Sequence, residues 1–448
     1  MKEFWKKLPR YRRLVILELY FVYFSLGVAV ILIGSILPSL RDANALSYGQ
    51  SGNLLSIQSI GFLLVGLVTG EAVNRLGIKK SFILTISFLP VGMFMLVRGG
   101  SFSFLSAAMF LVGLSKGAIT DYNNRVISDY ADGEAGPINS LHIFFAIGAC
   151  LAPFAALAMN RLSADRGWIY AMILSAMLAT AAVVFAIFVK IDLGAPHGPN
   201  DSSDSAGSAL TNVSSADTAL SDMHSRETGS GAAESDRLSD SGAPAGQRLQ
   251  ERSSSGSSLA FFREPLFLWT LLIGVCDQAL ESSLMGWLTT YYLETGIVGE
   301  TAAQMTTSLL WLCFLIGRIS CMLIAARWRP EKMLMIMGIG TAVSMACLSV
   351  SIHAPVLFLS TAGLGLCLSG VYGTAVSNAS RIFSRYSSSM GLYVTIAGIG
   401  GAAAPAAIGW VSDLSTVRNG FRVLVIVSVI LTFAVWMNRR LYAGAHKS

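Results

Sequence analysis

The sequence predicts an all-α membrane protein whose twelve transmembrane helices form two pseudo-symmetric six-helix bundles. Hydrophobic residues make up 53% of the chain and charged residues only 13%, about half the charged share of soluble domains. Apolar runs of about 18 residues or more recur along it, as membrane-spanning helices require. An element at 147–153 (IGACLAP) returns 252 residues later at 399–405 (IGGAAAP). Such repeats are typical of membrane transporters built from duplicated halves.

Six apolar segments precede a polar tract and six follow it. The expected spans are 14–38, 48–73, 80–98, 102–128, 138–159, 167–189, 266–293, 301–326, 332–350, 356–380, 388–412 and 420–438. We therefore expect an N-terminal six-helix bundle at 1–193, a disordered cytoplasmic linker at 194–258 and a C-terminal six-helix bundle at 259–448.

The polar tract contains 17 serines and nine acidic residues but no apolar run, so it cannot bury enough surface to fold. We expect a flexible tether, and regulation through phosphorylation stays open. With the termini inside, short inner segments carry 18 Lys or Arg residues and outer segments carry six. The positive-inside rule then places both termini and the tract in the cytoplasm of a multi-pass cell-membrane protein. The first apolar run is too long for a signal peptide and is expected to be an uncleaved span.

Motif searches exclude several classes of protein. The chain has no G-x-x-x-x-G-K-[ST], H-E-x-x-H or G-x-S-x-G motif, which argues against ATP hydrolysis and familiar hydrolases. We expect no enzymatic activity, no cofactor and no metal site. The net charge of +6 is spread beside the spans, which argues against nucleic-acid binding. The six cysteines lie in spans without C-x-x-C spacing and are expected to pack as small apolar residues.

A short segment between the second and third spans reads GEAVNRLGIKK from position 70 to 80. Its glycines permit a tight helix reversal, and its basic cluster anchors the turn at the membrane surface. The segment resembles the signature loop G-x-x-x-D-R-x-G-x-R-[RK] of the major facilitator superfamily, with Asn74 in place of the aspartate, so a charged gating contact is not implied there. The resemblance implies alternating access by rocking of two bundles, with conformational gating at Gly70, Asn74, Arg75, Gly77 and Lys79.

Other segments are similar to the fucose–proton symporter-like branch of that superfamily. They are GLSKG at 113–117 with Asp121, Asn123 and Asn124, NSLHIFFAIG at 139–148, and Glu281, Trp287, Tyr291, Trp311 and Arg318 in the second half.

Five charged residues lie well inside predicted spans: Lys116, Asp121, Asp277, Glu281 and Arg318. A charge at bilayer depth costs at least about 2.5–3.5 kcal/mol, so each needs a physical reason. Asp277 and Glu281 are four residues apart and share a helix face. Three acids against two bases leave one acid without a partner, as a proton-binding site requires.

The expected proton-coupling residues are Glu281, Asp121, Asp277 and His142, since histidine titrates near neutral pH. The rival interpretation is that the charges form fixed ion pairs, and Asp121 could pair with Arg125 one turn away. His142 could merely hydrogen-bond a neighbouring helix.

Expected substrate contacts are Lys116, Asn124, Trp287, Tyr291 and Arg318. The aromatic side chains, with Trp311 and Tyr372, could stack on a sugar ring; core packing or interfacial anchoring is the alternative. The pairs Gly66/Gly70 and Gly113/Gly117 have G-x-x-x-G spacing, which predicts close helix packing. The Gly and Pro residues of the repeated element are expected to loosen their helices.

These features predict a monomeric secondary active transporter in the lipid bilayer that moves a small polar organic solute by alternating access, coupled to protons. Sugars and organic anions are the candidate substrates. A drug or lipid efflux antiporter is one alternative and would need a wider apolar cavity. A non-transporting membrane sensor that signals through the linker is another; solute uptake that survives linker deletion would exclude it.

Overall fold

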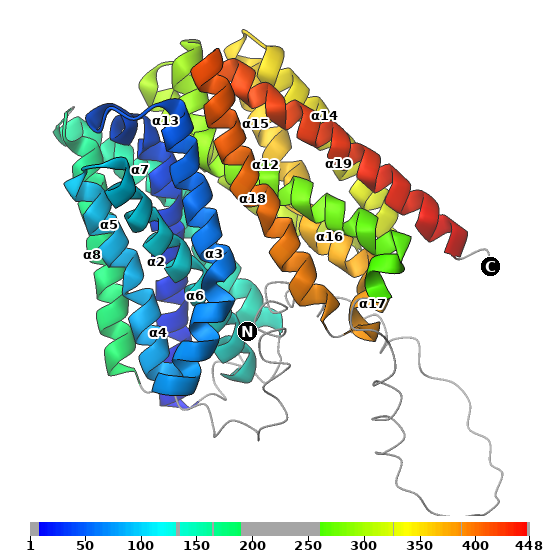
Figure 1. Ribbon diagram of the computed structural model, residues 1–448, viewed down its shortest axis with the longest axis horizontal. Coiled ribbons are helices and arrows are strands. Elements are labelled where there is room, and N and C mark those ends of the chain that lie inside the picture. The colour runs from blue at the N-terminus through cyan, green and yellow to red at the C-terminus, as the bar shows by residue number, and fades with distance from the viewer. Residues whose placement is uncertain are drawn as a thin grey trace, which may run out of the picture.

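The computed structural model describes residues 9–130, 135–163, 165–189, 260–325, 327–386 and 388–445, and within these ranges every regular element is a helix (Figure 1). The first half comprises α2 (Arg10–Ala43), α3 (Tyr48–Leu76), α4 (Ile78–Ile86), α5 (Phe88–Arg98), α6 (Phe102–Tyr130), α7 (Ala135–Leu162) and α8 (Gly167–Phe188). The second comprises η2 (Ala260–Arg263), α12 (Pro265–Thr295), α13 (Glu300–Ala325), α14 (Pro330–Val350), α15 (Ala354–Leu368), α16 (Val371–Asn378), α17 (Ser380–Arg385), α18 (Ser389–Leu414) and α19 (Val417–Ala445). The predicted linker at 194–258 lies outside the described residues.

The twelve predicted spans are confirmed. Ten segments of the described chain are long and apolar enough to cross a membrane, and α3, bent by 45°, is an eleventh. The twelfth is α12, which is 31 residues long and carries Asp277 and Glu281. Two spans are broken helices: α4 and α5 join at Ser87, and α15 and α16 join at Ser369 and Gly370.

Local sequence signals define the helix that later positions the site. Helix α3 begins with a capping box in which the Ser47 hydroxyl accepts a hydrogen bond from the Gln50 backbone at 3.1 Å and the Gln50 side chain accepts one from the Ser47 backbone at 3.0 Å. This arrangement satisfies amide groups that have no partner within the helix. Gly77, with φ of 77°, ends α3 and begins α4. Glycine reaches this conformation without a steric penalty.

The two halves are built alike. Helix α2 packs against α7 and α8 in the first half, and α12 packs against α18 and α19 in the second. The repeated element explains the likeness, because its glycines lie at matching contacts. A Cβ at Gly148 would overlap the Phe24 carbonyl of α2, and one at Gly400 would overlap the Val275 carbonyl of α12. These glycines therefore allow close packing, and the expected loosening of the helices by the repeated Gly and Pro residues stays a prediction.

This contact predicts a difference between two glycines. We expect Gly148→Ala to lower the free energy of unfolding by about 1–3 kcal/mol, the usual cost of overpacking. Gly66→Ala should leave it unchanged or raise it by up to about 1 kcal/mol, because alanine favours the helix and nothing lies within 4 Å of the new Cβ. Unfolding of the purified variants in detergent measures both, and equal losses would contradict the packing role of Gly148.

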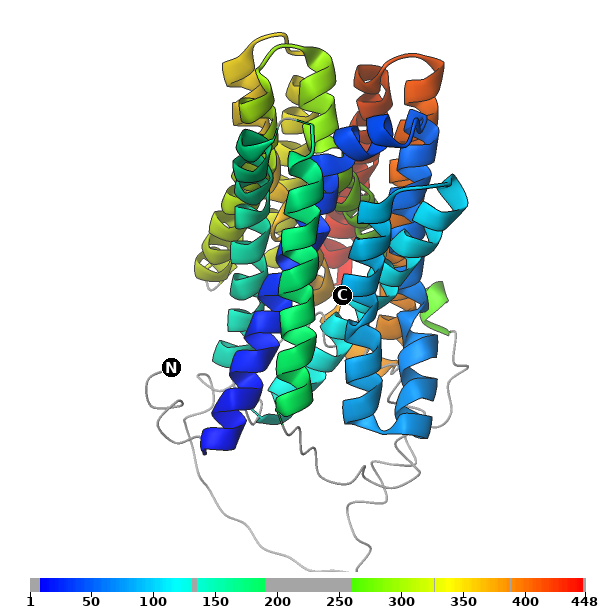
Figure 2. The same cartoon turned by 90° about the vertical axis from the view of Figure 1, so that its left-hand side faces the viewer.

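The halves meet along two equivalent pairs of helices, α3 with α18 and α7 with α13. The contact of α3 runs from Gly49, which lies against Asp413, to Leu63, which lies against Gly398. Beyond Leu63, a Cβ at Gly66 or Gly70 would meet nothing within 4 Å, and the two halves diverge (Figure 1). We call the end at the α2–α3 connection the closed end. The opposite end, where α2 begins and α3 turns into α4, is the open end (Figure 2).

The prediction of G-x-x-x-G packing is therefore confirmed for one pair and wrong for the other. A Cβ at Gly113 would overlap the Gln58 carbonyl of α3, and one at Gly117 would lie 2.7 Å from a methyl group of Val65. Gly66 and Gly70 contact no partner because they lie on α3 past the point where the halves separate. Spacing alone cannot distinguish a helix face that packs from one that faces open space.

Candidate functional site

Charged, amide and imidazole side chains from four helices gather between the two halves. Lys116, Asp121 and Asn124 come from α6, and His142 comes from α7. Asp277 and Glu281 come from α12, and Arg318 comes from α13. We call these seven residues the central cluster. It unites most of the predicted proton and substrate residues in one region.

Electrostatic interactions connect the members of the cluster across the interface. Lys116 of the first half interacts with Glu281 of the second. Arg318 interacts with Asp277 and Glu281 of its own half and with His142 of the other. Tyr23 of α2, which sequence reasoning missed, lies within reach of both Asp121 and Arg318. The acids and bases of both halves therefore influence one another.

The charges are not locked in close pairs. Among the described residues, no cluster member has an N–O ion pair within 4.0 Å. The Lys116 ammonium lies 5.2 Å from the centre of the Phe62 ring, and the Arg318 guanidinium lies 5.1 Å from that of Phe314. The rival pairing of Asp121 with Arg125 is not formed, since Arg125 is exposed and Asp121 is buried. The two bases therefore lie over aromatic rings rather than in close ion pairs with carboxylates.

Several buried polar atoms in the same region have no hydrogen-bond partner. They include one oxygen of Asp121, one oxygen of Asp277 and the indole nitrogen of Trp311. Buried polar groups without partners are costly and need an explanation such as a ligand, water or proton. A solute with several hydroxyl groups would satisfy both donors and acceptors of this kind.

A small cavity adjoins Glu281. It is lined by Glu281, Leu284, Met285, Leu310, Trp311, Phe314 and Leu368. Trp311 also lies across the interface from Phe145, with ring centres 5.3 Å apart. The carboxyl of Glu281 is therefore next to an aromatic wall contributed by both halves.

Two predicted substrate contacts lie elsewhere. Trp287 is fully buried and donates a hydrogen bond to the Pro405 carbonyl at 3.2 Å. Tyr291 is also fully buried, donates to the Leu348 carbonyl at 2.5 Å and stacks on Phe421 at 4.2 Å. In this conformation both have the surroundings of core packing, the alternative weighed from sequence. Their role in binding stays a prediction.

The signature loop lies at the open end. Arg75 pairs with Glu71 on the exposed surface, and Asn74 is exposed beside it. Lys79 donates a hydrogen bond at 2.9 Å to the Ile187 carbonyl near the end of α8, where the helix dipole favours a cation. These contacts stay within the first half, so the gating role of Gly70, Asn74, Arg75, Gly77 and Lys79 stays a prediction. No group of three or more His, Cys, Asp or Glu residues suited to a metal ion occurs in the part of the chain that the structure describes.

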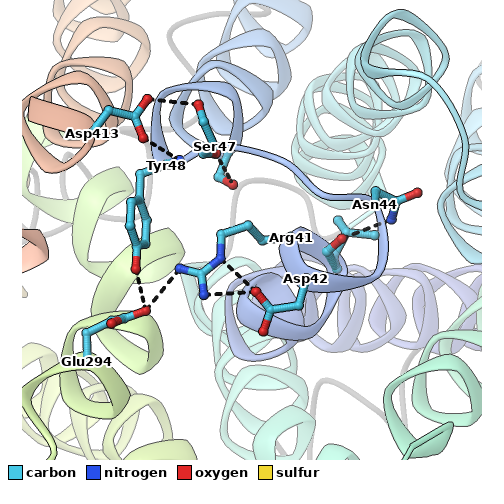
Figure 3. Close-up of polar contacts among 9 residues, drawn as sticks. Arg41, Asp42, Asn44, Ser47, Tyr48, Glu294 and Asp413 are labelled. Atoms are coloured by element: carbon cyan, nitrogen blue, oxygen red, sulfur yellow. Dashed lines mark hydrogen bonds and ion pairs between the residues drawn. The ribbon is translucent and has the colours of Figure 1, made fainter.

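One contact at the closed end centres on Glu294, at the end of α12 (Figure 3). Its carboxylate accepts a hydrogen bond from the Tyr48 hydroxyl at 2.6 Å and pairs with Arg41 at 3.0 Å. Arg41 also pairs with Asp42 at 2.9 Å and lies 4.4 Å from the centre of the Tyr48 ring. The connection between α2 and α3 is thus attached to the second half.

The other contact is made by Asp413, at the end of α18 (Figure 3). Its carboxylate accepts three hydrogen bonds at 2.8 Å, from the Ser47 hydroxyl and from the backbone N–H groups of Tyr48 and Gly49. The N-terminus of a helix carries partial positive charge and unpaired N–H groups, so it binds a carboxylate well. We call Arg41, Ser47, Tyr48, Glu294 and Asp413 the gate.

The sequence profile of the Major Facilitator Superfamily matches residues 19–379. The chain belongs to this superfamily. Among curated relatives, it is 24% identical to the glucose/mannose transporter GlcP of Bacillus subtilis over 92% of this chain and 91% of that protein. It is 26% identical to the mouse Major facilitator superfamily domain-containing protein 4A, over 34% of this chain and only 30% of that protein's length.

Solved structures of the superfamily share the fold. A bacterial homolog of the human lysosomal transporter Spinster, in an inward-facing and occupied conformation, aligns with a TM-score of 0.69, 13% identity and 97% coverage of each chain. The nucleoside transporter NupG aligns with a TM-score of 0.65, 13% identity and coverage of 96% and 99%. FucP in the outward conformation aligns with a TM-score of 0.58 and 14% identity, over 96% of this chain and 99% of that chain. These likenesses show the shared fold. The profile match bears out the resemblance to the superfamily, and the matches are consistent with its fucose–proton symporter-like branch.

The sequence did not predict the gate. Its residues lie in or beside predicted outer connections, where a charge costs little and therefore attracts no attention. One signal was present: Ser47 and Gln50 have capping-box spacing. That spacing predicts where α3 begins, but it does not predict that an aspartate more than 360 residues later binds the same helix end.

Proposed function

We propose that this protein is a secondary active transporter that moves a small polar, sugar-like solute by alternating access, coupled to protons. The observation that carries the proposal is the central cluster: acids and bases from both halves meet at the interface without forming close ion pairs. Contacts that differ between two arrangements of the halves let a ligand or proton shift the balance between those arrangements. The glucose/mannose transporter among its relatives supports a sugar-like substrate.

The residues of the central cluster have two roles in this proposal, proton binding and substrate contact. Glu281 or Asp121 would bind the proton, because protonating a buried carboxylate removes a costly charge. Lys116, Asn124 and Arg318 would contact the substrate or hold the acids when no substrate is present. Lys116 and Arg318 also make organic anions candidate substrates.

The distribution of basic residues supports a cytoplasmic location of the open end. The open end carries the start of α2 and the α3–α4 turn (Figure 2), which are rich in Lys and Arg. The conformation would then be closed to the outside by the gate and open to the inside. Transport would proceed by breaking the gate contacts while the signature loop meets the second half.

Ligand-dependent thermal stability tests the proposal. We expect glucose, mannose or a small organic anion to raise the unfolding temperature of the purified protein, since a ligand at 100 times its Kd stabilises the folded state by about 2.7 kcal/mol. The Lys116→Met/Arg318→Met variant should lose the effect. The same compound should accumulate in proteoliposomes under an inward proton gradient. A stabilising compound without measurable flux would contradict transport.

A further inference from the structure

A second acidic residue lies inside the first half, away from the central cluster. Glu18 of α2 is fully buried, with 0% of its surface exposed. Neither of its carboxyl oxygens has a hydrogen-bond partner, and no charged side chain acts on it in the described part of the chain. It was not among the intramembrane charges singled out from the sequence.

The duplicated architecture explains why Glu18 lacks partners. The repeat distance of 252 residues carries Glu18 onto Thr270 of α12. There, the Thr270 hydroxyl accepts a hydrogen bond from Asn438 at 3.0 Å, and the Asn438 carbonyl oxygen accepts one from Asn378 at 2.5 Å. This chain of bonds links α12 to α19 and α16.

The same shift carries Asn438 onto Ala186 of α8 and Asn378 onto Val126 of α6. Both are buried apolar residues, on helices that pack against α2 as α19 and α16 pack against α12. The first half therefore has a carboxyl group where the second has a hydroxyl, and aliphatic groups where the second has amides.

No titratable group on the surrounding helices acts on Glu18 in the described part of the chain, Asp121 and Lys116 of α6 included. On α6, Tyr122 pairs with Ser81 and Arg125 is exposed. On α7, the His142 ring packs edge-on against Tyr23 at 5.9 Å. Two helices of the second half, α12 and α13, also touch α2. Their charged groups, Asp277, Glu281 and Arg318, interact electrostatically with one another. A small cavity is lined by Val22 of α2 and by Ala182 of α8, one turn from Ala186. Its lining residues are apolar apart from Ser25.

We propose that Glu18 is a second proton-binding site, separate from the central cluster, and that it holds a proton in this conformation. An unpaired buried carboxylate costs far more than a neutral carboxylic acid in the same place. Releasing the proton requires water or a cation to reach Glu18, and hence a separation of α2 from α6 and α8. Alkaline pH therefore favours arrangements in which this interior is open.

Thermal unfolding of the full-length protein as a function of pH tests the site. The unfolded chain releases the proton of a glutamate near pH 4.3, whereas the folded protein keeps the proton of Glu18. The folded state then binds more protons, so its stability falls as pH rises, by up to tenfold in the folding equilibrium constant per pH unit for this one group. We expect the unfolding temperature of the wild type to fall more steeply between pH 6 and pH 9 than that of Glu18→Gln.

Two further variants make the outcome decisive. Glu18→Thr introduces the side chain that the second half has at the equivalent position, Thr270. Its unfolding temperature should also fall less steeply with pH than that of the wild type, even if the glutamine variant folds poorly. Glu281→Gln removes a carboxyl of the central cluster and should keep the part of the slope due to Glu18. Equal slopes for wild type, Glu18→Gln and Glu18→Thr would overturn the proposal. This readout does not involve solute flux, so it is independent of the proposed transport function.

Discussion

Replacing Glu281 with glutamine is expected to abolish proton-driven solute accumulation while leaving solute exchange intact. Glu281 interacts with Lys116 across the interface and with Arg318 in its own half, and it borders the cavity beside Trp311. Glutamine has nearly the shape of a protonated glutamate but cannot release a proton. The variant would therefore behave as if permanently protonated: the halves can still rock with solute bound, but no proton is carried.

Proteoliposomes separate the two activities. Uptake against a concentration gradient under an imposed proton gradient should fall to the level of protein-free liposomes, whereas counterflow of labelled against unlabelled solute should persist. Glu264→Gln is the matched control, because Glu264 directly precedes the same helix and its side chain is 41% exposed. Undiminished accumulation by Glu281→Gln would remove this residue from the coupling mechanism and leave Asp121 or Asp277 as candidates.

Covalent closure of the gate is expected to stop transport completely. The Ser47 hydroxyl and the Asp413 carboxylate are 2.8 Å apart, so cysteines at both positions should form a disulfide in this conformation. A transporter that must open at this end cannot complete its cycle while the bond persists. Mild oxidation of Ser47→Cys/Asp413→Cys should reduce transport to background, and dithiothreitol should restore it.

Single-cysteine variants control for the six native cysteines, which are all free thiols. Each single variant should be insensitive to the oxidant. Loss of the Asp413 carboxylate alone should weaken the closed arrangement, because it removes three hydrogen bonds at once. An oxidised double variant that transports at the rate of its reduced form would show that the closed end does not need to open.

The helices could be predicted from sequence because membrane burial requires long apolar runs, and that signal is local. The central cluster could also be predicted, since a charge such as Glu281 in an apolar run is conspicuous. Its geometry could not, because whether Asp121 pairs with Arg125 depends on which helix face is buried. Trp287 and Tyr291 show the same limit: an aromatic side chain on α12 has the same local sequence signal whether it faces the interface or Phe421.

Glu18 illustrates a different obstacle. It follows Arg12 and Arg13 closely, so its position near the start of a span makes it resemble an interfacial charge. Only the packing of α6 and α8 around α2 shows that it is buried. Comparison with Thr270 shows what is missing around it, and this comparison needs both the repeat distance and the contacts of the second half.

The bond between Asp413 and α3 has a consequence for how the protein tolerates substitution. Two of its three donors are backbone N–H groups, at Tyr48 and Gly49, and every residue except proline supplies one. Replacing the Tyr48 side chain would therefore leave its hydrogen bond to Asp413 in place and remove only the bond to Glu294. At Gly49 the added Cβ would lie 2.6 Å from the Asp413 carboxylate, so this position needs glycine. Proline is accepted at the first position of a helix, so Tyr48 is where a single residue could withdraw a donor without breaking the helix. We therefore expect position 48 to accept other residues without losing its backbone donor, whereas a change at position 413 removes the acceptor of all three hydrogen bonds.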